Sequence, residues 1–294
     1  MTGMIAHVGP NLPQELLRAS GRHAGALPFD PEAPTPTAEQ WMESKFAPWA
    51  RSILEGWAAG DYDDLEYVLF SRADDNAQRL YYYLCELQRR GLVGGPEPLI
   101  LDIAKVPRES SLARTEFSLR KLAEQLGVTG EALAEAITAC NAERRASTPA
   151  RADHTCLLAG TPPPDSRLHD AATHAGFTLI GPTLAETWTK LGAVVEVDRE
   201  PFSALARQVH SDPAGPRSFA DAGAALHHAI AECGAEAVVL WQIEEDEAQA
   251  WHLPAQRAAL AREGLPSLVL TRRDWLARDG AAAEITAFLK GIAP

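Results

Sequence analysis

Short apolar runs alternate with longer segments of helical periodicity along almost the whole chain. The apolar runs predict strands at residues 4–8, 23–27, 67–70, 99–103, 155–159, 177–180, 193–197, 237–241 and 267–270. The longer segments predict helices at residues 13–20, 38–59, 75–90, 114–126, 130–145, 165–175, 217–232, 252–263 and 282–292. This alternation is typical of parallel sheets whose strands are joined by crossover helices. The sequence therefore predicts an α/β fold with two Rossmann-like or flavodoxin-like parallel-sheet domains and additional helices.

The helical period is interrupted at Ser147-Thr148-Pro149, where a proline follows two small polar residues. We place the domain boundary there. An N-terminal α/β domain with a helical segment is expected over residues 1–148, and a C-terminal α/β domain over residues 149–294.

Composition and charge narrow the classes of partner. Hydrophobic residues make up 46% of the 294 residues and charged residues 23%, as in ordinary soluble globular proteins. The net charge of −13 repels a nucleic-acid backbone. The chain has no apolar run near the roughly 20 residues that cross a bilayer, and its first residues lack the pattern of a secretory signal. We expect a cytoplasmic protein that binds neither nucleic acid nor membrane.

The four cysteines, Cys85, Cys140, Cys156 and Cys233, are widely spaced and form no C-x-x-C pair of the kind that supplies a local metal half-site. Their settings within helices and at a strand start suit small buried hydrophobic side chains. Convergence of the four cysteines on an iron-sulfur cluster stays open as an alternative.

In open α/β sheets, ligands bind beyond the carboxyl ends of the strands. The loops expected there are Gly9–Asn11, Ser71–Asp75, Ala104–Glu109, Gly160–Asp165, Gln242–Glu247 and Thr271–Asp274. The prolines of the fourth loop lack the amides that bind phosphate. The acidic run from Glu244 to Glu247 is typical of a solvated surface rather than of a metal site, and isolated histidines such as His7 and His252 are more often structural.

One segment carries a family resemblance. The run WARSILEGWAAGDYDDLEYVLFSRADDNAQRLYYYL, over Trp49–Leu84, resembles the 2-hydroxyacyl-CoA dehydratase and benzoyl-CoA reductase subunit family, of the 2-hydroxyglutaryl-CoA dehydratase D-component type. The order of four further motifs extends the resemblance over nearly the full length. These are GPNLPQELLRASGRHAGALP (Gly9–Pro28), PLILDIAKVPRE (Pro98–Glu109), CLLAGTPPPDSRLHDAATHAGFTLIG (Cys156–Gly181) and the closing stretch GLPSLVLTRRDW (Gly264–Trp275) with EITAFLKGI (Glu284–Ile292).

The resemblance implies three cysteines that hold a [4Fe-4S] cluster, and none of them is present. The first position falls at or near Ala47, the second at or near Ala73, and the third within Ile243–Glu247. Asp74 matches the acidic residue after the second cysteine and Arg79 a basic position in the next helix, but neither replaces a thiolate. The chain is thus similar to a degenerate family member, with no cofactor expected of its own and a [4Fe-4S] cluster expected in a partner subunit.

The resemblance further implies an accessory or structural subunit that forms a heterodimer with a cluster-bearing homologue acting on an acyl-CoA thioester. A separate ATP-dependent activator protein is an implied partner. The alternative is a stand-alone enzyme, or an acyl-CoA or small-molecule binding protein, that uses the interdomain cleft without a cluster. No catalytic residue is assigned. The candidate substrate-binding residues of the cleft are Ser71, Arg72, Asp74, Asp75, Arg108 and Glu244.

Overall fold

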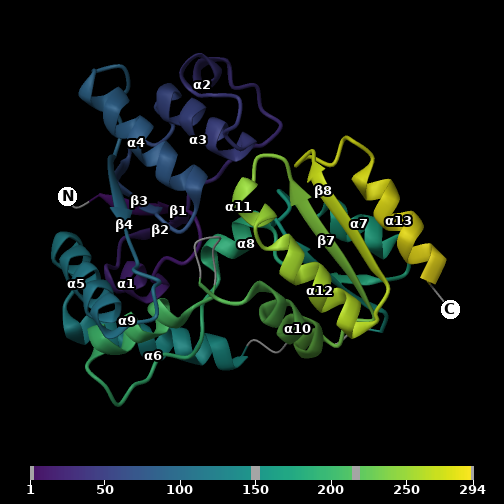
Figure 1. The fold of residues 1–294 in the computed structure, drawn as a ribbon. Helices are drawn as coiled ribbons and strands as arrows, with labels where there is room; N and C mark the ends of the chain where they lie inside the picture. Colours follow the sequence, from purple (N-terminus) through teal and green to yellow (C-terminus); the bar gives the residue numbers. More distant parts are fainter. Residues whose placement is uncertain (1–2, 147–152, 214–218, 293–294) are drawn as a thin grey trace. The chain divides into compact units, whose positions relative to one another are not determined.

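The computed structural model describes residues 3–146, 153–213 and 219–292. The chain forms two compact units, each made of two segments. The first unit comprises residues 1–147 and 188–219, and the second comprises residues 148–187 and 220–294. Figure 1 shows both as ribbons.

The first unit has a four-stranded, all-parallel sheet in the order β2-β1-β3-β4. Its elements in chain order are β1 Met4–Val8, α1 Gln14–Ala19, β2 His23–Ala26, α2 Pro36–Trp41, α3 Pro48–Ala59, β3 Leu65–Ser71, α4 Asp75–Arg89, β4 Glu97–Leu101, α5 Glu109–Leu126, α6 Gly130–Ala146 and α9 Pro201–Ser211.

Alternation along β1 separates the two faces of this sheet. Ile5 belongs to a buried cluster with Leu69, Leu119 and Leu205, so α5 and α9 cover this face together with α1 and α6. Helices α3 and α4 lie on the other side of the sheet (Figure 1). Their buried faces include Ile53 of α3 and Leu80 and Leu84 of α4.

The second unit repeats the same arrangement, with strand order β6-β5-β7-β8 and parallel pairing throughout. Its elements are β5 Thr155–Gly160, α7 Arg167–Thr173, β6 Thr178–Ile180, α10 Ala222–Cys233, β7 Ala237–Ile243, α11 Glu247–Ala250, α12 Leu253–Glu263, β8 Ser267–Arg273 and α13 Ala281–Ile292. Helix α8, Leu184–Thr189, runs from the second unit into the first. Every residue of β7 is buried, as expected of a central parallel strand. The prediction of two parallel-sheet α/β domains is confirmed.

Two elements expected from the sequence are wrong. The single helix over residues 38–59 is divided, because Ala47 precedes Pro48 and adopts an extended ψ of 145°. The strand expected at residues 193–197 is absent from the described structure. The backbone N–H of Val195 donates to Oδ1 of Asn141 at 3.0 Å, and Nδ2 of Asn141 donates to the carbonyl of Val195 at 2.8 Å. These groups are satisfied by a side chain, so Val195 needs no neighbouring strand.

The segment that contains Val195 packs with the first unit, whereas the sequence placed it in the C-terminal domain. A buried ion pair joins Arg144 of α6 to Glu15 of α1, and Arg144 also donates from Nε to the carbonyl of Gly192 at 2.8 Å. Helix α9, which the sequence did not predict, adds Phe202 and Leu205 to the core of the first unit. The boundary itself, at residues 148 and 149, and the predicted helix start at Arg217 lie outside the described residues.

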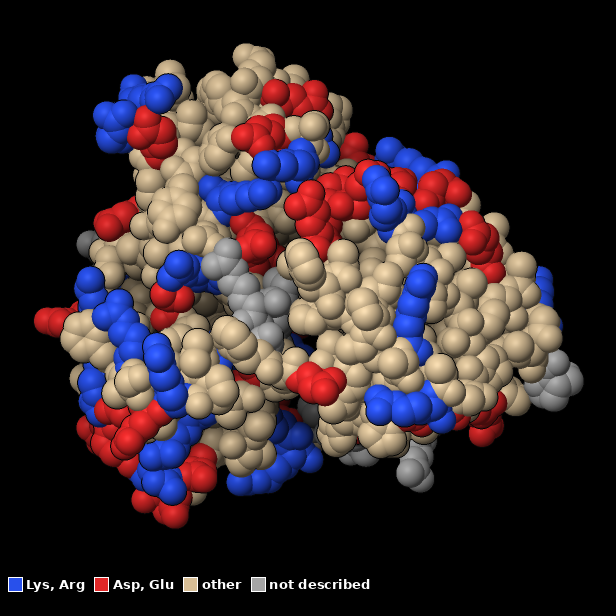
Figure 2. All heavy atoms as spheres, viewed as in Figure 1, with Lys and Arg blue, Asp and Glu red and all other residues tan. Residues whose placement is uncertain are grey.

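Two further observations bear on the expected partners. Over the described ranges, no helix is both long enough and apolar enough to cross a bilayer. On the face drawn in Figure 2, basic and acidic side chains are interspersed over the region of α5 and α9 rather than gathered into one basic patch.

Candidate functional site

The strand order places the topological switch point of the first unit between β1 and β3, because β1 pairs with both β2 and β3. The loops Gly9–Asn11 and Ser71–Asp75 follow these two strands. They pack closely: Gly9 has a φ of +95°, and a Cβ added there would lie 2.8 Å from the Cβ of Ser71. A side chain at position 9 would therefore displace the turn.

The turn Ser71–Asp75 is held by its own polar side chains. The backbone N–H of Ala73 donates to Oγ of the buried Ser71 at 3.1 Å. Asp74 is the N-cap of α4, accepting at Oδ1 from the N–H of Ala77 at 2.8 Å. Arg72 forms an ion pair with Asp102 just beyond β4. Four of the six candidate residues thus lie together, and three of them, Ser71, Arg72 and Asp74, make contacts that shape the turn.

The start of α3 meets the start of α4 next to this turn. The backbone N–H of Ala47 donates to Oδ1 of Asn76 at 3.0 Å. Phe46 packs edge-on against Tyr83, with ring centroids 5.2 Å apart, and the guanidinium of Arg79 lies 5.4 Å from its ring centroid. Phe46 and Ala47 are only 1% and 2% exposed. The first two positions implied for cluster ligands are therefore in neighbouring segments of a packed site.

The other two candidate residues lie elsewhere. Arg108 precedes α5 and its Nε donates to Oγ of Ser111 at 3.3 Å, so its side chain folds over its own helix start. Glu244 belongs to the second unit, where its exposed carboxylate pairs with Arg272 at 3.0 Å. The expected cleft that would join Glu244 to the others stays a prediction.

In the second unit, a side-chain hydrogen bond connects the loops that follow β5 and β7, on either side of the switch point of that sheet. Thr161 donates from Oγ1 to Oδ2 of Asp246 at 3.0 Å. Trp275 donates from Nε1 to the carbonyl of Pro162 at 3.0 Å. A Cβ at Gly160 would lie 2.1 Å from the carbonyl oxygen of Trp241, so only glycine fits there. The third implied ligand position, Ile243–Glu247, is part of this edge.

The sequence did not identify a polar cluster around His7, near the end of β1. Nδ1 of His7 lies 2.9 Å from Nε2 of His23, and Nε2 of His7 lies 3.1 Å from the carbonyl oxygen of Trp188. Gln14 donates to the same carbonyl at 3.0 Å. Burial lowers the pKa of both imidazoles to about 4, with smaller contributions from His23 to the first and from Arg18 to the second. The sequence does show His7 as a histidine within a buried strand. It does not indicate that His23, 16 residues further along the chain, is the partner of His7.

Of the four cysteines, Cys140 and Cys156 are buried and Cys85 and Cys233 are partly buried. Burial raises the pKa of all four thiols, and that of Cys156 to about 12. Thiolate, the form that binds iron, is therefore disfavoured at neutral pH. Cys85 and Cys140 lie in the first unit and Cys156 and Cys233 in the second.

The chemistry of the Ala47 and Ala73 positions follows from their side chains. Methyl groups offer no lone pair, so these positions do not fit an iron-sulfur cluster. Within the described ranges, no group of three or more His, Cys, Asp or Glu side chains is arranged to hold a metal ion.

Comparisons of the sequence with protein-family models and with curated proteins gave no match.

Proposed function

We propose that the chain is a cluster-less accessory or structural subunit of a complex of the 2-hydroxyacyl-CoA dehydratase and benzoyl-CoA reductase type. In this proposal it pairs with a homologous subunit that bears a [4Fe-4S] cluster and acts on an acyl-CoA thioester. The observation that carries the proposal is the hydrogen bond from Ala47 to Asn76, which joins the starts of α3 and α4. In the family that the sequence resembles, the helix start that matches α3 and the strand-end turn that matches Ser71–Asp75, just before α4, each present a cysteine.

The architecture around the missing ligands supports a scaffold role. Gly9 is packed against Ser71, Asp74 caps α4, and Phe46 is buried against Arg79. These contacts require defined side chains although the first two ligand positions, Ala47 and Ala73, hold only methyl groups. Retention of the packing without the ligands suits a subunit whose task is to present a surface to a partner.

The polar groups of the turn favour this role over chemistry within the chain. Arg72 is paired with Asp102, and Asp74 accepts a helix N–H. Both side chains are thus engaged in contacts that shape the turn. A stand-alone enzyme or acyl-CoA binding protein, acting through a cleft between the domains, stays the alternative prediction.

Co-expression with a cysteine-bearing homologue from the same genome tests the proposal. We expect a tagged form of this chain to retain the homologue through size-exclusion chromatography as a heterodimer. Iron and absorbance at about 400 nm should belong to the homologue. The matched control is this chain expressed alone and purified anaerobically. A monodisperse protein that retains no such homologue would contradict the proposal, and a thermal shift of the isolated chain with acyl-CoA would favour the alternative.

A further inference from the structure

A cavity of about 560 Å³ lies in the first unit between the edge strand β2 and helix α3. Small residues create it: Ala24 and Ala26 of β2, Ala6 of β1 and Gly56 of α3 all line the space. Larger side chains at these positions would fill the gap between strand and helix. The volume falls within the range of small-molecule sites, which is about 300 to 1,000 Å³.

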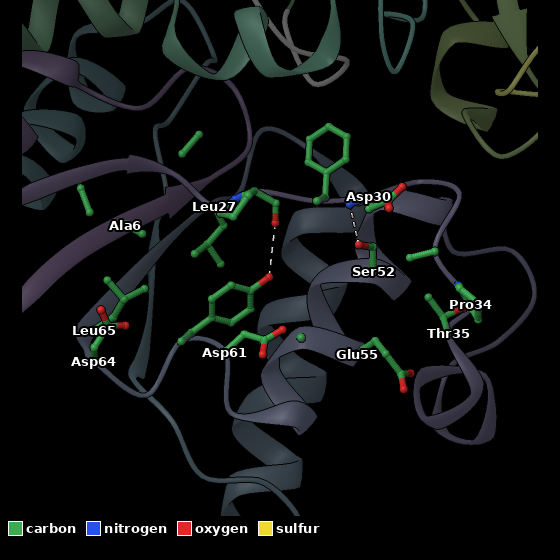
Figure 3. Close-up of a pocket in the computed structure, with 17 residues that line it drawn as sticks. Ala6, Leu27, Asp30, Pro34, Thr35, Ser52, Glu55, Asp61, Asp64 and Leu65 are labelled. Atoms are coloured by element: carbon green, nitrogen blue, oxygen red, sulfur yellow. Dashed lines mark hydrogen bonds between the residues drawn. The ribbon is translucent and has the colours of Figure 1, made fainter.

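The walls of the cavity are fixed by hydrogen bonds (Figure 3). Tyr62 donates from its hydroxyl to the carbonyl of Pro28 at 3.3 Å. The N–H of Asp30 donates to Oγ of Ser52 at 2.8 Å. Together these bonds tie the loop after β2 to α3 and to the loop before β3, so the cavity is formed without a ligand.

The lining combines an apolar surface with carboxylates. The apolar part includes Ala6, Leu27, Phe29 and Leu65. The carboxylates are those of Asp30, Glu55, Asp61 and Asp64. Of the described residues that line the cavity, none is Lys, Arg or His. A ligand in such a site gains binding free energy when it buries an aliphatic body against the apolar surface and places positive charge near the carboxylates.

Backbone N–H groups, rather than Lys, Arg or His side chains, hydrogen-bond the carboxylates of Glu55 and Asp30. Glu55 accepts at Oε2 from the N–H groups of Thr37 and Ala38, both at 2.8 Å, and Asp30 accepts from the N–H of Glu32 at 2.9 Å. These are bonds to backbone amides, and the described structure contains no ion pair to Asp61 or Asp64. Burial, with a smaller contribution from Asp61, raises the pKa of Tyr62 to about 12, so the phenol stays neutral and adds no negative charge.

The carboxylates are arranged around the cavity rather than at one point. Within the described residues they form no group of three that could hold a metal ion. We propose that the cavity between β2 and α3 binds an aliphatic diamine or polyamine, whose charges are separated by methylene groups. The phosphates of an acyl-CoA would be repelled by this lining, so the site is independent of the subunit role proposed above.

Titration calorimetry of the full chain with 1,5-diaminopentane at low salt tests the proposal. We expect saturable binding, and no binding of 1,5-pentanediol, which has the same length without charge. Asp61 is exposed, so Asp61→Asn should weaken binding by about fivefold, the effect of losing one exposed ion pair. The matched control is Asp63→Asn, which removes the same charge from the same loop outside the cavity lining and should change affinity less than twofold.

Filling the cavity gives a second, independent readout. Ala26→Leu should abolish binding, and its fold can be checked by circular dichroism against the wild-type chain. Equal losses from Asp61→Asn and Asp63→Asn would show only diffuse attraction to an acidic protein and would overturn the proposal. It would also be overturned if the diol bound as well as the diamine, or if the diamine showed no heat of binding.

Discussion

His7 and His23 form a hydrogen-bonded imidazole pair with a Nδ1 to Nε2 distance of 2.9 Å. The carbonyl of Trp188 can only accept, so Nε2 of His7 carries a proton and its Nδ1 accepts from His23. His7 is 0% exposed, and burial is the largest cause of the low pKa of both rings. Both imidazoles are therefore neutral at pH 7 and bridge β1, β2 and Trp188.

This pair predicts a loss of stability in mild acid. The folded pKa of His7 is about 4, against 6.5 for the unfolded chain, so between these values the unfolded state binds more protons. Stability is complete above about pH 6.5 and declines as the pH falls towards 4. At about 1.4 kcal/mol per unit of pKa, His7 contributes on the order of 3 kcal/mol to this decline. Urea unfolding at a series of pH values measures it.

A variant isolates the buried imidazole. His7→Gln should lower stability at pH 7 but flatten its dependence on pH between 6.5 and 4. The matched control is His228→Gln on α10, where the side chain is 81% exposed, and it should leave the slope unchanged. An unchanged slope for His7→Gln would show that the acid sensitivity arises elsewhere.

Asn76 is predicted to hold the starts of α3 and α4 together. In Asn76→Ala the buried N–H of Ala47 loses its acceptor, at an expected cost of about 1 to 3 kcal/mol in the free energy of unfolding. Asn76→Asp keeps an acceptor oxygen and serves as the control. Amide hydrogen exchange at Ala47 should accelerate in the alanine variant alone. Equal protection in both variants would contradict the assigned bond.

Glu15 is predicted to anchor residues 188–195 to the first unit through Arg144. Its side chain is 2% exposed and that of Arg144 is 7% exposed, so Glu15→Gln leaves a buried guanidinium without its counter-charge. The expected loss is on the order of 3 kcal/mol, with faster proteolysis near Gly192. Glu143→Gln breaks the exposed pair with Arg18 and should cost less than about 1 kcal/mol. Equal losses from the two variants would refute the anchoring role.

The sequence predicted the parallel sheets because buried strands such as 237–241 are continuous apolar runs between helical segments. It missed α9 and the return of residues 188–219 to the first unit. Gly192 and Val195 are attached by single polar contacts, from Arg144 and Asn141, which leave no periodic signal. Helix α9 instead packs Phe202 and Leu205 into the buried cluster of the first unit, and an apolar helix face alone does not indicate which unit it covers. Contacts between residues far apart in the chain decide this part of the fold.

The candidate site likewise combines features that the local sequence predicts with contacts between residues far apart in the chain. The turn Ser71–Asp75 was predicted from its place after a strand and before a helix, and it lies at the switch point. The cap formed by Asp74 follows from local chemistry, since Asp favours the N-cap position. The pairing of Arg72 with Asp102 and of Ala47 with Asn76 depends on how two strands and two helices pack, and pattern alone carries no information on either.

The closeness of the two helix starts predicts that thiolates placed there will share a metal ion. Ala47→Cys combined with Ala73→Cys should bind Co²⁺, seen as thiolate-to-metal absorbance, because two thiolates from adjoining segments supply half of a tetrahedral site. The control combines Ala73→Cys with Ala59→Cys at the far end of α3, roughly 18 Å along the helix from Ala47. The first variant should bind about tenfold more tightly than the control, which corresponds to about 1.4 kcal/mol. Equal affinities would mean that the positions matching the family's first two ligands do not converge, and would remove the main support for the proposed subunit role.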